Sequence, residues 1–245
     1  MESKMSDLSL YNQDCLQVMK ELSDDSIDLI LTDPPYNLGL FMKDRDTNLK
    51  KMRSNFFGAA GWDDLSVADW EQSIDSFFEE SARLLKKGGS MIVFMAIIKA
   101  DTLIKLALKH KLYYKTTGIW HKTNPMPRNM NLHFINSTES WVYFTFGKRT
   151  GTFNNNGKAL HDFYETSVTP AGEKKCGKHP TQKPISLMEH FVTVLSNEDE
   201  TILDPFMGSG STGVAAINKG RHFIGIELNE DYFELASNRI NEVHQ

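Results

Sequence analysis

Hydrophobic and polar positions divide the chain into short apolar runs and longer segments with helical spacing. Residues 27–32 form a short apolar run, which predicts a buried strand. Residues 70–87 carry apolar side chains at helical spacing and run into Gly88-Gly89, which predicts a helix that ends at the glycine pair. The same patterns predict strands over 90–96, 113–120 and 141–146 and helices over 98–111 and 185–195.

The clearest alternation lies towards the end of the chain. Strand patterns over 201–206 and 222–227 alternate there with helix patterns over 211–219 and 231–241. Such alternation predicts a mostly parallel sheet with helices on both faces. We therefore expect one α/β domain of the doubly wound type over residues 1–245.

Two stretches break the alternation. Residues 39–64 are polar, basic in the middle and rich in Gly and Asn, and residues 147–179 are equally irregular. Long segments without a pattern inside a compact domain usually carry function or move. We expect both to be surface loops that meet the partner.

The composition is that of an ordinary globular protein, with 245 residues, 40% hydrophobic and 24% charged. No apolar run reaches the ~20 residues needed to span a bilayer. Residues 1–7 lack the basic and then apolar pattern of a signal peptide. Cys15 and Cys176 are far apart and indicate neither a metal site nor a disulfide framework. These features predict a cytoplasmic protein without a membrane partner.

The net charge of −5 argues weakly against a nucleic-acid partner, although binding depends on local patches. Residues 102–138 contain no Asp or Glu, which indicates either a nucleic-acid surface or an ordinary basic surface. The basic residues of this stretch are Lys105, Lys109, Lys111, Lys115, Lys122 and Arg128.

A glycine-rich motif lies between a predicted strand and a predicted helix. Residues 208–213, Gly-Ser-Gly-Ser-Thr-Gly, match the pattern G-x-G-x-x-G, and Glu227 ends the next predicted strand. Such a loop lets a ligand approach the backbone, and the acid can accept hydrogen bonds from ribose hydroxyls. The pattern indicates an adenosine-containing cofactor and leaves NAD and S-adenosylmethionine open. A tight turn without a ligand is the other interpretation.

The residues before the glycines favour S-adenosylmethionine. Asp204 and Phe206 provide a carboxylate and a ring face, which suit the sulfonium and ammonium of that cofactor. A dinucleotide pyrophosphate would be repelled by the carboxylate. No second nucleotide-binding half follows Glu227, so an NAD-dependent oxidoreductase is the lesser hypothesis.

Asp33-Pro34-Pro35-Tyr36 directly follows the predicted strand 27–32. Catalytic groups in open parallel sheets lie at the carboxyl ends of strands, and two prolines give a rigid turn. The Asp33 carboxylate and the Pro34 carbonyl can accept the two hydrogens of an adenine amino group, which frees its lone pair. Tyr36 can stack on a base flipped out of the duplex. A strand-ending turn without chemistry is the alternative for this motif alone.

Together these motifs resemble the amino-group DNA methyltransferases. Asp33-Pro34-Pro35-Tyr36 looks like their catalytic motif, and residues 204–210 look like their cofactor motif. This order of motifs resembles the β group of the family, which includes many adenine methyltransferases of restriction-modification systems. Further similar segments are residues 12–15, 85–94, 120–125 and 178–184.

The resemblance implies S-adenosyl-L-methionine as cofactor and a Rossmann-like sheet of seven strands, partly antiparallel near one edge. It implies the catalytic residues Asp33, Pro34, Pro35 and Tyr36. It implies cofactor binding by Asp14, Cys15, Asp33, Thr181, Lys183, Asp204, Phe206, Gly208, Gly210, Ser211, Thr212 and Glu227. No metal is implied.

The resemblance also implies the substrate. Asp33 at the first motif position favours adenine N6 in DNA over cytosine N4, RNA or protein glutamine, whose enzymes usually carry Ser or Asn there. Double-stranded DNA is the expected partner, with single-stranded DNA as an alternative. Many β-group enzymes are homodimers, and a restriction-modification enzyme acts beside a cognate restriction endonuclease. A catalytically silent DNA-binding subunit is the remaining alternative.

The region available for target recognition is short, about residues 122–178, so we expect help from a flexible DNA-facing loop over about 39–64. Basic side chains in both segments can track phosphates or, for Arg128, reach a guanine edge. Ordinary solvated charges are the alternative for each. The candidate DNA-binding residues are Lys43, Arg45, Lys50, Lys51, Arg53, Lys122 and Arg128.

Overall fold

The computed structural model describes residues 7–38, 65–127, 131, 134–177 and 179–244. The strands are β1 (Leu8–Tyr11), β2 (Ile27–Thr32), β3 (Leu85–Met95), β4 (Leu112–Lys122), β5 (Thr138–Phe146), β6 (Phe163–Thr166), β7 (Thr201–Asp204) and β8 (His222–Ile226). The helices are α1 (Cys15–Glu21), α4 (Val67–Leu84), α5 (Ala100–Lys109), α6 (Ile185–Leu195), α7 (Ser211–Asn218) and α8 (Glu230–His244), with 3₁₀ turns η2 (Ile97–Lys99) and η3 (Ala171–Lys174).

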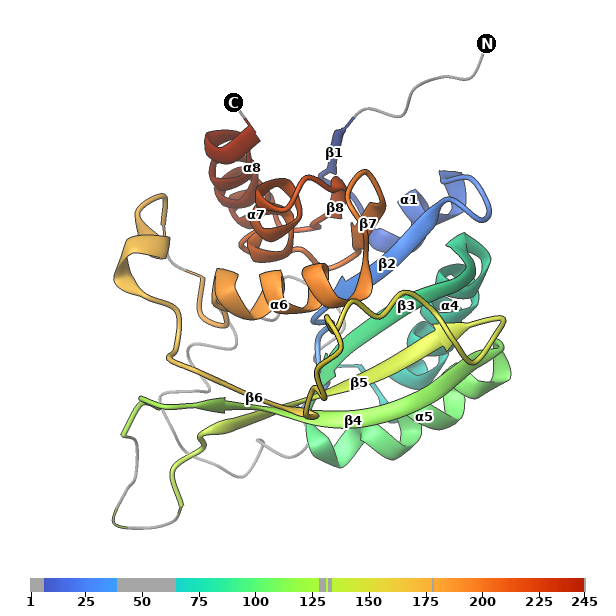
Figure 1. Ribbon diagram of the computed structural model, residues 1–245, viewed down its shortest axis with the longest axis horizontal. Coiled ribbons are helices and arrows are strands. Elements are labelled where there is room, and N and C mark those ends of the chain that lie inside the picture. Colours follow the sequence, from blue (N-terminus) through green and yellow to red (C-terminus); the bar gives the residue numbers. More distant parts are fainter. Residues whose placement is uncertain (1–6, 39–64, 128–130, 132–133, 178, 245) are drawn as a thin grey trace.

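The strands form one sheet in the order β1-β8-β7-β2-β3-β5-β4-β6 (Figure 1). Neighbouring strands run parallel, except that β5 is antiparallel to both β3 and β4. The prediction of a doubly wound, mostly parallel α/β fold is confirmed. The expected number of strands is wrong, because the sheet has eight strands rather than seven.

The hydrophobic pattern did not predict two short strands, β1 and β6. β6 lies inside the stretch 147–179 that the sequence predicted as irregular, and it pairs with the outer side of β4. Its four side chains alternate between exposed and half-buried, so they leave no apolar run. β1 is equally short and is half-buried throughout. Both strands depend on pairing with a longer neighbour, which local sequence does not reveal.

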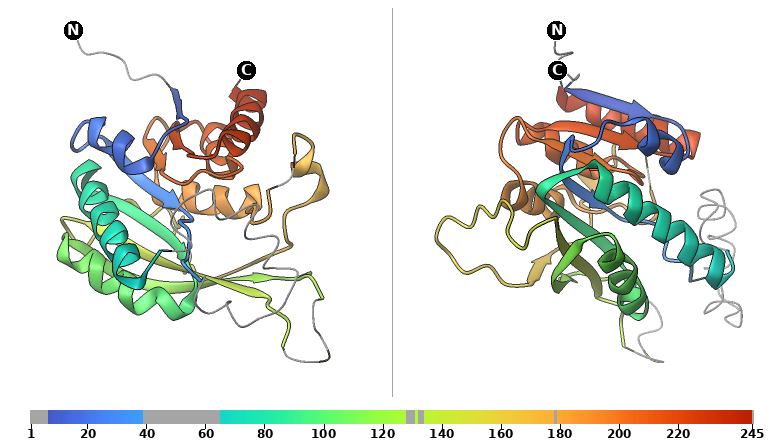
Figure 2. Two further views of the ribbon diagram at one scale, coloured as in Figure 1. Left: turned by 180° about the vertical axis from the view of Figure 1, so that it is seen from behind. Right: turned by 90° about the vertical axis from the view of Figure 1, so that its right-hand side faces the viewer.

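Helices cover both faces of the sheet (Figure 2). α1, α4 and α5 pack on one face, and α6, α7 and α8 pack on the other. Alternate residues of a central strand serve the two cores: Ile30 faces the first, whereas Leu29 and Leu31 face the second. Because both sides are buried, central strands appear in the sequence as continuous apolar runs. In the described residues, no helix is long and apolar enough to cross a bilayer.

The helix that the sequence predicts over 70–87 ends before the Gly88-Gly89 pair that was expected to terminate it. α4 begins after the N-cap Ser66, whose hydroxyl accepts the Asp69 N–H at 3.1 Å, and it ends at Leu84. Leu85 already pairs with Ile27 of β2, so sheet pairing ends the helix. The expected end at Gly88-Gly89 is therefore wrong, because both glycines lie within β3 where its register against β2 shifts.

A tight contact in the antiparallel part of the sheet gives a stability prediction. A Cβ atom on Gly118 of β4 would lie 1.9 Å from Cζ2 of the buried Trp141 ring on β5. Gly118→Ala should therefore force that ring to move and lower the free energy of unfolding by about 1–3 kcal/mol. Urea denaturation followed by circular dichroism would measure the change.

The matched control is Gly172→Ala in η3, where an added Cβ would meet no atom within 4 Å. That variant should unfold close to the wild-type midpoint. Equal stability of the Gly118→Ala protein and the wild type would contradict the packing described for β4 and β5.

Candidate active site

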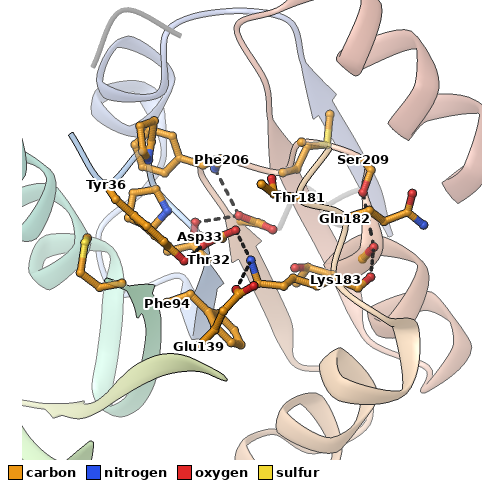
Figure 3. Close-up of a pocket in the computed structure, with 18 of the residues that line it drawn as sticks. Thr32, Asp33, Tyr36, Phe94, Glu139, Thr181, Gln182, Lys183, Phe206 and Ser209 are labelled. Atoms are coloured by element: carbon orange, nitrogen blue, oxygen red, sulfur yellow. Dashed lines mark hydrogen bonds and ion pairs between the residues drawn. The ribbon is translucent and has the colours of Figure 1, made fainter. Parts of the chain in front are cut away.

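A cavity of about 630 Å³ lies at the carboxyl ends of the central parallel strands. Asp33 follows β2, Pro205 follows β7 and Glu227 follows β8, and all three line the cavity. Parallel strands present their carboxyl ends at one edge of a sheet, so segments far apart in sequence meet there. Figure 3 shows Asp33, Tyr36, Lys183 and Phe206 converging on this space.

The cavity brings together the predicted catalytic and cofactor-binding residues, with Gly210 as the exception. Gly210 has a φ of +77° at the N-cap of α7, and a Cβ atom there would lie 3.0 Å from the Cβ of Ala236 in α8. Gly210 therefore lies on the side of the loop that packs against α8, where only a residue without a side chain fits. The predicted residues that line the cavity are Asp14, Cys15, Asp33, Pro34, Pro35, Tyr36, Thr181, Lys183, Asp204, Phe206, Gly208, Ser211, Thr212 and Glu227.

The glycine loop and Glu227 are joined by backbone hydrogen bonds. The N–H of Gly208 donates to one oxygen of the Glu227 carboxylate at 2.9 Å, and the N–H of Asn229 donates to the other at 2.9 Å. Gly208 has a φ of +52°, a conformation that favours glycine. From α8, the buried Arg239 donates to the carbonyl of Ser209. Sequence reasoning missed Arg239, because a basic residue in a terminal helix usually faces solvent.

Asp204 lines the cavity and is itself buried. Its carboxyl accepts hydrogen bonds from the Thr32 hydroxyl at 2.8 Å and from the Phe206 N–H at 3.2 Å. Burial raises the pKa of Asp204 to about 7, because the low-dielectric interior disfavours the charged form more than the hydrogen bonds favour it. The Asp204 contacts to Thr32 and Phe206 tie the two sequence motifs together.

The charges around the cavity suit a positively charged ligand. Five acidic residues line it, and Lys183 is the single lysine or arginine among the described lining residues. His179 adds no charge near neutral pH, since burial lowers its pKa to about 4. A sulfonium and an ammonium are favoured in such surroundings, whereas a pyrophosphate is repelled. The residues present therefore fit S-adenosylmethionine better than NAD.

Asp14 and Cys15 line the cavity at the start of α1. Asp14 is the N-cap of α1, and its carboxylate accepts the Gln17 N–H at 3.1 Å. The Cys15 thiol is buried, and burial raises its pKa well above the usual range, so it stays protonated. Thr181 is exposed at the rim beside His179, whose ring packs edge-on against Tyr232 at 4.3 Å.

The Asp33-Pro34-Pro35-Tyr36 turn is held from two sides. The Tyr36 hydroxyl donates to Oδ1 of Asp33 at 2.5 Å, and Lys183 donates to Oδ2 (Figure 3). From α4, the Trp70 indole N–H donates to the Pro35 carbonyl at 3.3 Å. Neighbouring helices and loops thus fix the position of the Asp33 carboxylate.

Sequence reasoning missed Glu139, which lies at the start of β5 and forms an ion pair with Lys183 at 3.1 Å. An acidic residue two positions before the apolar run of 141–146 was the available indication. Among the predicted DNA-binding residues, Lys122 forms an ion pair with Glu139 at 2.5 Å and lies 5.0 Å from the centre of the Trp120 ring. The others, Lys43, Arg45, Lys50, Lys51, Arg53 and Arg128, lie outside the described residues.

Comparison with known proteins identifies the family of this chain. Residues 27–238 match the model of the N6/N4 family described as DNA methylase. The chain belongs to this DNA methylase family. It is 30% identical over 243 residues to the type II methyltransferase M2.LlaDCHI of Lactococcus lactis subsp. cremoris, with 95% of this chain and 89% of that protein covered.

Solved structures agree with the family assignment. The M1.HpyAVI complex with S-adenosylmethionine shares 26% identity at a TM-score of 0.69, covering 96% of this chain and all of that one. The cytosine-N4-specific PvuII methyltransferase shares the fold at a TM-score of 0.76 and 18% identity, covering 98% of this chain and 92% of that one. The predicted enzyme class, a DNA methyltransferase dependent on S-adenosylmethionine, is confirmed.

The raised pKa of Asp204 gives a prediction on cofactor binding by this methyltransferase. Below about pH 7 the free enzyme holds Asp204 protonated, whereas a bound cation favours the carboxylate. S-adenosylmethionine should therefore bind more weakly as the pH falls from 8 to 6, by at most about tenfold per pH unit. Titration calorimetry across this range would measure the change.

Asp204→Asn provides the comparison, because it keeps the shape and cannot ionise. Its affinity for S-adenosylmethionine should be lower at pH 8 and should vary less with pH. An identical pH dependence in the wild type and the Asn variant would assign the effect to another group.

Proposed function

We propose that this methyltransferase methylates the N6 amino group of an adenine flipped out of double-stranded DNA. The observation that carries the proposal is that the Asp33–Tyr36 turn and the Gly208 loop line one cavity. A site for the target base and a site for the cofactor are thus adjacent. Flipping makes the base accessible at a cost of a few kcal/mol, and stacking on an aromatic ring returns ~1–3 kcal/mol.

The chain's own residues bind and orient the amino group. The Asp33 carboxylate and the Pro34 carbonyl accept its two hydrogens, which draws the nitrogen lone pair out of conjugation with the ring. A carboxylate can accept about four hydrogen bonds. Asp33 can therefore accept an amino hydrogen in addition to the hydrogen bonds from Tyr36 and Lys183. Preorganised acceptors of this kind act through orientation and electrostatics. When bound, S-adenosylmethionine supplies a methyl group on a positively charged sulfur.

The cofactor is held by groups whose chemistry matches its parts. Glu227, fixed by the N–H groups of Gly208 and Asn229, retains lone pairs for the ribose hydroxyls. The carboxyl groups of Asp204 and Asp14 and the Phe206 ring all line the cavity, and positive charge is favoured near such groups.

Asp33 supports adenine as the target, because relatives that act on cytosine N4 usually carry Ser at this motif position. The fold itself does not select the base, since PvuII methyltransferase, named as cytosine-N4-specific, has the same architecture. The similar M2.LlaDCHI is named a type II methyltransferase, which supports a role in restriction-modification. A homodimer, a cognate restriction endonuclease and DNA contacts by residues 39–64 and 122–178 stay predictions.

The chemistry is tested by product analysis. The wild-type enzyme, incubated with S-adenosylmethionine and unmethylated genomic DNA, should produce N6-methyladenine, measured by mass spectrometry of nucleosides. Formation of N4-methylcytosine without N6-methyladenine would show that the base assignment is wrong.

The role of Asp33 has its own test. Asp33→Ala should abolish detectable transfer and leave the dissociation constant for S-adenosylhomocysteine within about threefold of wild type, because the loss falls on the base amino group. Asp101→Ala, which removes an exposed carboxylate paired with Lys105 on α5, is the matched control and should keep full activity. Sustained transfer by the Asp33→Ala enzyme would refute the proposed role.

A further inference from the structure

Four side chains of alternating charge connect the catalytic turn to the antiparallel part of the sheet. The Lys183 ammonium contacts Oδ2 of Asp33 and lies 3.1 Å from Oε2 of Glu139. Oε1 of Glu139 in turn lies 2.5 Å from the ammonium of Lys122. Figure 3 shows Lys183 between the two carboxylates, on the far side of Asp33 from Tyr36. The four groups come from four separate segments: the turn after β2, the end of β4, the start of β5 and the residues before α6.

Lys183 is buried to an extent that is unusual for a lysine. Its side chain is only 7% exposed, and its ammonium lies 5.1 Å from the centre of the Phe94 ring. Burial of a lone ammonium is costly, but the carboxylates of Asp33 and Glu139 compensate for it. Together they raise the pKa of Lys183 above its ordinary value. The group therefore stays an ammonium, which donates hydrogen bonds and does not accept a proton.

The main chain and the side chain of Lys183 face different partners. Its carbonyl accepts the Ser211 hydroxyl at 2.8 Å, which ties the backbone to the first turn of α7 behind the glycine loop. Its ammonium points away from that loop and ends on the carboxylate that receives the target base. The resemblance of the motif assigned Lys183 to cofactor binding, whereas these contacts place its charge at Asp33.

We propose that Lys183 is a positioning residue for methyl transfer, and that Glu139 holds it in place. Lys183 fixes Oδ2 of Asp33, so that Oδ1, on the Tyr36 side, is presented to the base amino group. Glu139 keeps the ammonium from moving towards the acidic cofactor side of the cavity. This inference rests on the proposed role of Asp33.

The proposal predicts a specific kinetic pattern. A misplaced Asp33 carboxylate weakens the reaction after both substrates have bound, so kcat falls while cofactor affinity is kept. Since displacement of a reacting group by about 1 Å can cost 10²-fold, Lys183→Met should lower kcat by about that factor. Lys183→Arg keeps the charge and should recover most of the loss. Glu139→Gln should lower kcat less, because Asp33 still holds Lys183.

The experiment measures kcat, the KM for S-adenosylmethionine and the dissociation constant for S-adenosylhomocysteine in these variants. Unmethylated genomic DNA is the substrate, and total methyl incorporation is the readout. Lys219→Met is the matched control, because Lys219 pairs with Glu189 on the surface at 3.3 Å and should be dispensable for activity. Thermal unfolding of each variant separates loss of folding from loss of catalysis.

The outcomes are distinct. A fall in kcat with S-adenosylhomocysteine affinity within about threefold of wild type, restored by Arg, supports the proposal. A weakened affinity with kcat unchanged at saturation would make Lys183 a cofactor-binding residue and overturn it. Unchanged kcat in Lys183→Met would overturn it as well. If Lys183→Met does not fold, the test rests on Lys183→Arg and Glu139→Gln, and wild-type kcat in Glu139→Gln would overturn the role of Glu139.

A wrong base assignment and a wrong role for Lys183 would appear in different measurements. The identity of the methylated base comes from the wild-type product, whereas the role of Lys183 comes from the ratio of kcat values. An enzyme that methylates cytosine N4 would disprove the adenine assignment and leave the kinetic comparison valid.

Discussion

The parallel pairing of β2 with β7 is the constraint on which the rest of the site depends. It sets Leu29 opposite Ile202 and Ile30 opposite Leu203, so both strands end at the same level of the sheet. The two sequence motifs, one beginning at Asp33 and the other at Asp204, emerge there side by side. The Thr32 hydroxyl spans this junction to Asp204, joining residues 172 positions apart. Without this register, the two motifs would not line one cavity.

The sequence was most informative where local chemistry is distinctive. The glycine loop and the Asp33 turn follow apolar runs, and they contain glycines, which adopt conformations that other residues avoid, and prolines, whose φ is fixed. Their place at strand ends was therefore predictable. Features set by partners distant in sequence were not. The helix α4 stops at Leu84 because Leu85 pairs with Ile27, and β6 exists because β4 offers it an edge.

The same distinction applies inside the site. Asp33, Asp204 and Glu227 were identified from their motifs, but the ion pairs of Lys183 were not, because β5 approaches only in the folded sheet. Burial of ionisable groups without partners costs free energy. In this cavity, ion pairs and backbone N–H donors compensate for much of that cost. The carboxyl of Asp204 is only partly compensated, and its pKa is raised because burial outweighs the hydrogen bonds that it accepts.

The reversed direction of β5 has a consequence for the charge of the cavity wall. Because β5 is antiparallel to its neighbours, its first residues lie at the edge where the other strands end, and Glu139 joins the site from there. Lys122 at the end of β4 and Glu139 at the start of β5 therefore lie at the same edge as the Asp33–Tyr36 turn. The wall of the cavity thus combines strands that end at this edge with one strand that begins there, so its charge depends on chain segments of both directions.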